Sequence, residues 1–208
     1  MITQEKALSW RYATKKFDNE KKLTSEQVNY LVESARLAPT SFGLQPFRLL
    51  IVEDQSVRQQ LKAAAWNQEQ ITSASHLLVF ASVKDLSEKH VDDFVALTAK
   101  ERGLDPADLS DYKNMMVGAV NGMSTEQKLA WAQKQAYIAL GFVILSGALA
   151  EIDSCPMEGF DRSEFDRILN LEANNLTATV ILPVGYRASD DKYAGLKKVR
   201  LPIDEFVV

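Results

Sequence analysis

The chain has 208 residues, of which 46% are hydrophobic, and its 24 Lys and Arg against 28 Asp and Glu give a formal net charge of −4. A chain of this length usually forms one domain and buries about 70% of the surface exposed by its unfolded form. We therefore expect a single domain over residues 1–208. The acidic balance argues against binding to duplex nucleic acid, which requires a dense basic surface.

Cysteine and histidine content limits the metal and redox chemistry. Cys155 is the only cysteine, so the chain cannot form an internal disulfide, and His76 and His90 have no cysteine partners at zinc-site spacing. The N-terminus lacks the apolar segment of a secretory signal, and the longest uncharged stretch, residues 135–150, is shorter than the ~20 residues of a membrane span. We expect a cytoplasmic protein without a metal ion or a membrane contact.

The first half of the chain combines helix caps with apolar strand patterns. In order, we predict a helix from Thr3 to Trp10, a capping-box helix from Thr24 that Pro39 ends, a loop over 40–46, a strand over 47–52, a helix from Asp54 to Ala65, a buried strand over 76–82 and a helix over 85–102.

The second half contains a long helix, opened by a capping box at Ser124 and running through Ala150, that is apolar nearly all round from Ala136. Such a helix must be covered on every side, either as the central helix or at a subunit interface, and we favour an obligate dimer. The other expected elements are a mobile helix or lid-like excursion over 107–122, a strand over 152–155, a helix capped by Asp161, a strand over 177–186 with a bulge or edge position at Pro183, and a C-terminal arm from Arg187 that reaches onto another surface, such as the partner subunit.

Several common catalytic motifs are absent from the sequence. It has no Gly-x-Gly-x-x-Gly after a strand, no Walker loop, no Gly-x-Ser-x-Gly elbow and no His-Glu-x-x-His. These absences disfavour Rossmann dinucleotide folds, P-loop enzymes, common serine hydrolases and zincins. A lone cysteine before Pro156 is more often a buried small hydrophobe than a nucleophile.

Four separated segments carry residues suited to ligand binding. Residues 11–18 are basic, residues 38–46 form a rigid polar loop, residues 155–160 form a glycine-containing loop, and residues 197–202 place two cations, Lys198 and Arg200, two positions apart near the C-terminus. Any one of these cations alone is more often part of a solvated surface.

Together, and in this order, the four segments resemble those of the NAD(P)H-dependent FMN nitroreductase family, of the oxygen-insensitive nitroreductase and dihydropteridine reductase type. The most specific parts are Pro-x-Glu-Gly-Phe at 156–160, after an apolar helix, and Lys-x-Arg-Leu-Pro at 198–202. The resemblance runs nearly end to end. It implies an α+β fold with a central mixed or antiparallel sheet flanked by helices, and a homodimer that binds FMN at the subunit interface.

The resemblance also implies which residues contact the cofactor. Arg11, Lys198 and Arg200 are expected at the FMN phosphate, where arginine offers a bidentate fork, and Lys15 is expected at the N1/O2 edge of the ring. Asn67 is expected to contact the pyrimidine edge.

Two loops complete the expected site. Residues 39–41 match the loop that reaches the flavin from the other subunit, and residues 156–159 match the loop that lies over the ring with a backbone N–H facing N5. The expected cofactor set is Arg11, Tyr12, Ala13, Lys15, Pro39, Thr40, Ser41, Asn67, Gln70, Pro156, Met157, Glu158, Gly159, Lys198 and Arg200, and the expected substrate set is Ser41, Phe42, Met116 and Gly159.

This chain departs from the family pattern at two positions. Ala13 stands where the family often has serine, which removes a hydroxyl donor to the phosphate. Gln70 stands where many members have lysine. A neutral amide stabilises an anionic reduced flavin less than a cation does, so we expect a somewhat lower reduction potential.

The implied activity is that of an FMN-dependent oxidoreductase. NADPH or NADH would reduce the flavin in a ping-pong, two-electron hydride transfer, and nitroaromatics, quinones or similar electron-poor molecules would accept the hydride. No catalytic acid or base is expected, because the chemistry takes place at FMN N5. The alternatives are a reductase for one narrow metabolite, such as a dihydropteridine or an enone, an oxygen-using flavin enzyme, and a dimeric ligand-binding domain without turnover.

Overall fold

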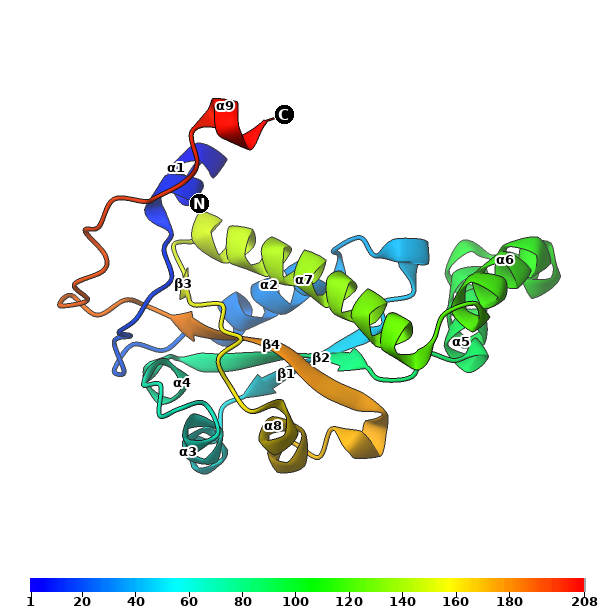
Figure 1. Ribbon diagram of the computed structural model, residues 1–208. Coiled ribbons are helices and arrows are strands. Elements are labelled where there is room, and N and C mark those ends of the chain that lie inside the picture. Colours follow the sequence, from blue (N-terminus) through cyan, green and yellow to red (C-terminus); the bar gives the residue numbers. More distant parts are fainter. Residues whose placement is uncertain (208) are drawn as a thin grey trace.

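The computed structural model describes residues 1–207, and its centre is a four-stranded sheet (Figure 1). The strand order is β1 (Phe47–Val52), β2 (His76–Val83), β4 (Leu176–Gly185) and β3 (Asp153–Ser154). All neighbouring strands run antiparallel. The α+β architecture expected from the sequence is therefore confirmed.

The helices begin at the capping residues that the sequence indicates. The capping boxes of Thr24 and Ser124 are both formed, and the side chains of Thr3, Asp54 and Asp161 accept backbone N–H groups of the helices they precede. The helices are α1 (Gln4–Trp10), α2 (Ser25–Arg36), α3 (Gln55–Ala63), α4 (Gln70–Ser73), α5 (Glu88–Arg102), α6 (Ser110–Asn121), α7 (Thr125–Leu149), α8 (Arg162–Ile168) and α9 (Ile203–Phe206).

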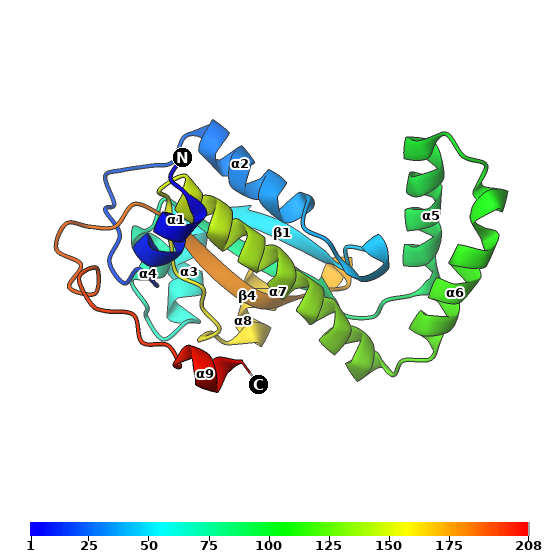
Figure 2. The same ribbon diagram turned by 90° about the horizontal axis from the view of Figure 1, so that it is seen from above.

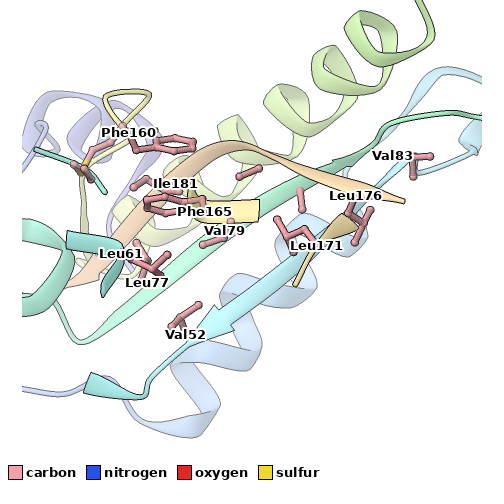
Figure 3. Close-up of a cluster of buried hydrophobic side chains, with 14 of the residues drawn as sticks. Val52, Leu61, Leu77, Val79, Val83, Phe160, Phe165, Leu171, Leu176 and Ile181 are labelled. Carbon is pink, nitrogen blue, oxygen red and sulfur yellow. The ribbon is translucent and has the colours of Figure 1, made fainter. Parts of the chain in front are cut away.

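Strand β2 is buried along its whole length because helices cover both faces of the sheet. Successive residues of a strand point to opposite faces. On one face, Leu77 and Val79 pack with Ile181 of β4, Leu61 of α3 and Phe165 of α8 in the cluster that Figure 3 shows.

The opposite face of the sheet packs against α2 and α7. There, Leu78 and Phe80 of β2 lie in one cluster with Leu31 of α2 and Val143 of α7. The two clusters explain why residues 77–81 form an almost continuous apolar run: each face of this strand contacts a different layer of helices.

Helix α7 leaves part of its apolar surface exposed. Tyr137, Ile138 and Phe142 are 38%, 40% and 44% exposed, and their spacing along the helix places them on one side of it. Among residues 1–207, no helix combines the length and apolarity needed to cross a membrane.

The structure refines two local predictions. The sequence predicts a bulge or an edge position at Pro183, but the bulge lies at Thr179, where the register shifts between Phe80 and Ala81. Pro183 pairs with Leu77 of β2, and its carbonyl oxygen accepts a hydrogen bond from the amide of Cys155. The weakly patterned residues 107–122 are expected to form a mobile helix or a lid-like excursion, and most of them, residues 110–121, form the helix α6, which packs beside α5. Figure 2 shows this pair beyond the N-terminal end of α7, with α1 at the other end.

Arg58 is a cation in the interior, and backbone carbonyls solvate it. The side chain is fully buried and donates to the carbonyl oxygens of Ile71 at 2.7 Å, Ala74 at 2.7 Å and Ser75 at 3.1 Å. Burial lowers the pKa of Arg58 to about 10. These bonds fix the segment that joins α4 to β2.

We expect the free energy of unfolding to fall as the pH drops below about 6.5, the ordinary pKa of histidine. Burial lowers the pKa of both His76 and His90, so the unfolded chain gains protons first as the pH falls. The loss is at most about 1.4 kcal/mol per pH unit for each histidine. Urea unfolding at pH 7.5 and 5.5 measures it. The double variant His76→Gln, His90→Gln should have a shallower dependence, and an equally steep one would contradict this origin.

Candidate functional site

The two ends of the chain meet beside α1. Lys198, in the C-terminal tail, donates from Nζ to the carbonyl oxygen of Ser9 at 2.6 Å and to the carbonyl oxygen of Arg11. Burial and the charge of Arg200 lower the pKa of Arg11. Burial and the charges of Arg11, Arg200 and Arg187 lower the pKa of Lys198. Cations from both ends therefore lie close enough to repel one another.

The charges of these cations are not balanced by ion pairs within the described residues. Within residues 1–207, no carboxylate forms an ion pair with Arg11, Lys15, Lys198 or Arg200. Moreover, Nε of Arg11 is buried without a hydrogen-bond partner. A buried donor normally has a partner, so the arrangement fits an anion that supplies acceptors at this point.

Arg187 lies close to these cations, but its guanidinium contacts other side chains of the fold. It pairs with the buried carboxylate of Asp153 at 2.6 Å, and its guanidinium stacks over the rings of Trp10 at 4.1 Å and Tyr12 at 4.6 Å. Asp153 also accepts from the hydroxyl of Thr14 at 3.3 Å. These contacts hold the segment that carries Arg11 against β3.

We call Arg11, Lys15, Lys198 and Arg200 the cation cluster. Lys15 connects this cluster to the loop over residues 155–160. Its Nζ lies 3.8 Å from Sγ of Cys155, a fully buried residue. Burial raises the pKa of the Cys155 thiol, although Lys15 opposes this shift. Cys155 is thus a buried thiol beneath the cations, as the sequence indicates.

The loop continues to Gly159, which the segment between α3 and α4 contacts. Gln68 donates from Nε2 to the carbonyl oxygen of Gly159 at 2.7 Å, and a Cβ added at Gly159 would lie 2.6 Å from the ring of Trp66. Trp66 and Asn67 both have left-handed backbone conformations, with φ of 53° and 57°. Asn67 and the Gly159 loop, expected to belong to one site, are therefore adjacent parts of the fold.

Glu158 is held by a helix residue that the sequence did not single out. The hydroxyl of Tyr137 in α7 donates to Oε1 of Glu158 at 2.5 Å. Burial and this hydrogen bond raise the pKa of Tyr137. Both side chains line a polar pocket of about 480 Å³ together with Phe160 and Arg162. The remaining loop residues differ in exposure, since Met157 is buried and Pro156 is exposed.

Within the described part of the chain, the loop at residues 39–42 makes no hydrogen bond to the side chains of the cations named above. Residues of α7 and α6 hold this loop. The amide of Ser41 donates to the side chain of Gln135 at 2.8 Å, and the hydroxyl of Tyr112 donates to the carbonyl oxygen of Phe42 at 3.0 Å. Phe42 has a φ of 57°, an uncommon value for a residue with a bulky side chain, and its ring packs near Trp131. Pro39 is exposed, and Thr40 is partly buried.

The structure places Met116, an expected substrate contact, in the interior. Met116 is fully buried in the core cluster, whereas the neighbouring Met115 is 52% exposed. Consecutive helix residues point about 100° apart, and the weak apolar pattern of this segment did not reveal which one faces inward. Gln70, at the start of α4, is largely buried, and Ala13 forms an isolated parallel bridge with Ser154.

Comparisons with known proteins show the family of this chain. The model of the nitroreductase family matches residues 8–186. A Staphylococcus saprophyticus relative that bears the name "Putative NAD(P)H nitroreductase" is 32% identical over 209 residues, covering 97% of this chain and 94% of its own.

Solved structures share the fold. The ydfN protein of Bacillus subtilis matches with a TM-score of 0.87 and 26% identity over 97% of this chain and 96% of its own. An Exiguobacterium sibiricum protein solved in complex with FMN matches with a TM-score of 0.84 and 21% identity over 100% of this chain and 97% of its own. The match to the family model and the identity to the S. saprophyticus relative show that the chain belongs to the nitroreductase family.

Proposed function

We propose that this protein is an FMN-dependent oxidoreductase that uses NADPH or NADH to reduce electron-poor organic molecules. The observation that carries the proposal is the cluster of Arg11, Lys15, Lys198 and Arg200, which has no ion-paired carboxylate within residues 1–207 and includes the buried Nε of Arg11, for which these residues supply no hydrogen-bond partner. The relative's name and the FMN in the E. sibiricum structure support it.

The residues present fit FMN at this position. Arg11 and Arg200 would bind the phosphate, Lys198 would orient the backbone of Arg11 and add positive charge, and Lys15 would lie at the ring edge. The Gly159 loop, fixed by Gln68, would present its backbone to the ring. Bound FMN would supply the hydride chemistry, accepting two electrons from the nicotinamide and passing them to the acceptor. The protein's part is to bind, orient and leave one ring face open.

We propose that the functional unit is a homodimer, the known arrangement for this family. The exposed apolar side of α7 supports it, because Tyr137, Ile138 and Phe142 together form a surface suited to a subunit contact. A second copy would also bring its own loop of residues 39–41 to the site, as the family resemblance implies, with Phe42 directly after it. Ser41 and Phe42 would then come from the partner subunit.

The acceptors we propose are flat and electron-poor, such as nitroaromatics and quinones. A shallow stacking site discriminates poorly among such molecules. A narrow reductase for a dihydropteridine or an enone, an oxygen-using flavin enzyme, or a dimeric ligand-binding domain would use the same fold.

Purified full-length protein tests the proposal directly. We expect a yellow protein whose flavin absorbance is bleached by NADPH or NADH under argon and restored by a quinone or a nitroaromatic compound. Added in separate cuvettes, the two nicotinamides reveal the preferred reductant. A protein that binds FMN but is not reduced would favour the ligand-binding alternative, and one that ignores added FMN would contradict the proposal.

Replacing Gln70 with lysine is expected to raise the reduction potential of bound flavin. The added cation would stabilise an anionic reduced ring, and an interaction of about 1 kcal/mol corresponds to roughly 20 mV for two electrons. The potential is measured by slow reduction with xanthine and xanthine oxidase in the presence of a reference dye. The variant Gln70→Glu, with the opposite charge, should lower the potential. No rise with lysine would contradict a role for this position in tuning the flavin.

A further inference from the structure

Asp191 is a buried carboxylate at the root of the C-terminal tail. It is 6% exposed, and it accepts four hydrogen bonds from groups far apart in sequence. Oδ2 accepts from the hydroxyl of Tyr12 at 2.8 Å and from the amides of Lys15 at 2.9 Å and Lys16 at 3.1 Å. Oδ1 accepts from the amide of Tyr193 at 3.1 Å.

These bonds join the two segments that carry the cation cluster. Three of the donors belong to residues 12–16, which follow Arg11 and include Lys15, and the fourth belongs to the tail that continues to Lys198 and Arg200. The amide of Ala188 adds a backbone bond to the carbonyl oxygen of Lys16 at 2.9 Å. Beyond Asp191, residues 192–207 are all exposed, so little burial fixes the tail itself.

The carboxylate is ionised in this environment. Burial alone would favour its neutral form, but the hydrogen bonds from Tyr193, Tyr12, Lys16 and Lys15 outweigh burial and lower the pKa of Asp191. Burial, and after it the hydrogen bond to Asp191, raise the pKa of Tyr12. A negative charge is thus kept close to a site whose positive charges would bind a phosphate.

By charge alone, Asp191 opposes phosphate binding, and its contribution must therefore come from geometry. Four hydrogen bonds to an ionised acceptor order the backbone on both sides, and ordering a binding site in advance reduces the conformational entropy lost when a ligand binds.

We infer that Asp191 is a positioning residue for the FMN site: by joining residues 12–16 to the C-terminal tail, it sets Arg11 and Lys15 against Lys198 and Arg200. This inference rests on the proposed function. Asp191 touches no cofactor atom in this role and acts through the segments that it connects.

The test is the dissociation constant of FMN for the flavin-free, full-length protein, followed by quenching of flavin fluorescence. Asp191→Asn removes the charge and two good acceptor positions while keeping the shape. We expect its Kd to rise at least ten-fold. The matched control is Asp190→Asn, the neighbouring exposed carboxylate that pairs with Lys16, and its Kd should stay within two-fold of the wild type.

The sign of the change separates geometry from charge. If Asp191 acted only through its field, Asp191→Asn would bind FMN more tightly than the wild type, and this result would overturn the inference, as would an unchanged Kd. The proposed function is judged separately by the wild-type protein. If the wild type does not bind FMN, both claims fail, whereas tight binding by the wild type and by Asp191→Asn defeats only the inference.

A second variant decides the matter if Asp191→Asn does not fold, which circular dichroism and thermal unfolding reveal. Tyr12→Phe removes one of the four donors and leaves the carboxylate charged. We expect it to raise the Kd for FMN several-fold with little change in melting temperature. An unchanged Kd for this variant would then overturn the inference.

Discussion

The variant Arg11→Ala is expected to bind FMN about 100-fold more weakly than the wild type. Hydrogen bonds to a charged group contribute about 1.5–3 kcal/mol each, and a 100-fold change corresponds to about 2.7 kcal/mol. Nε of Arg11 is buried and has no hydrogen-bond partner within residues 1–207, so this donor is available to an acceptor on the ligand. Fluorescence titration of the flavin-free protein measures the loss.

Two further variants control this result. Arg102→Ala removes an exposed arginine at the end of α5 and should leave FMN affinity unchanged, which excludes a general effect of net charge. Arg11→Lys keeps the charge but lacks the bidentate fork, so its affinity should lie between those of the wild type and Arg11→Ala. Arg11→Ala with wild-type affinity would show that the phosphate binds elsewhere.

The variant Phe142→Asp is expected to convert the proposed dimer to a monomer and to lose FMN as a consequence. Phe142 is 44% exposed on the apolar side of α7, and placing a carboxylate in a buried contact there costs several kcal/mol unless it finds a partner. Light scattering after size exclusion should give twice the 23.3 kDa chain mass for the wild type and the single chain mass for the variant.

Phe142→Leu is the matched control, because it keeps the position apolar and should remain dimeric. Absorbance of the eluted peaks reports bound flavin in the same experiment. A dimeric Phe142→Asp variant that retains FMN would place the subunit contact on another surface. A monomeric variant that still binds FMN would separate flavin binding from dimerisation.

Local patterns were sufficient to predict most of the secondary structure. Thr24 and Ser124 form their capping boxes because a cap depends on residues only three positions apart. The position of the bulge depends on the pairing of two distant strands, and the sequence pointed to Pro183 where the structure has Thr179. The inward orientation of Met116 likewise depends on tertiary packing, because its helix α6 packs beside α5. Periodicity within α6 alone did not predict that orientation.

The candidate site divides along the same line. Arg11, Lys15, Lys198 and Arg200 were identified because they match family positions, and the structure brings both chain ends together at Lys198 and Arg11. Pairs that depend on tertiary proximity left no signal in the sequence. In the sequence Tyr137 is one more aromatic residue of an apolar helix, and only the fold places Glu158 beside it. Asp190 and Asp191 are adjacent aspartates, and only the fold distinguishes them by burying Asp191 and exposing Asp190.

The most direct test of the central claim compares the affinities of FMN and riboflavin for the full-length protein. The two ligands share the isoalloxazine ring and differ by the phosphate that the cation cluster would bind. If Arg11, Lys198 and Arg200 form a phosphate site, FMN should bind at least about 100-fold more tightly than riboflavin, and added salt should narrow the difference. Equal affinities, or no binding of either flavin, would contradict it.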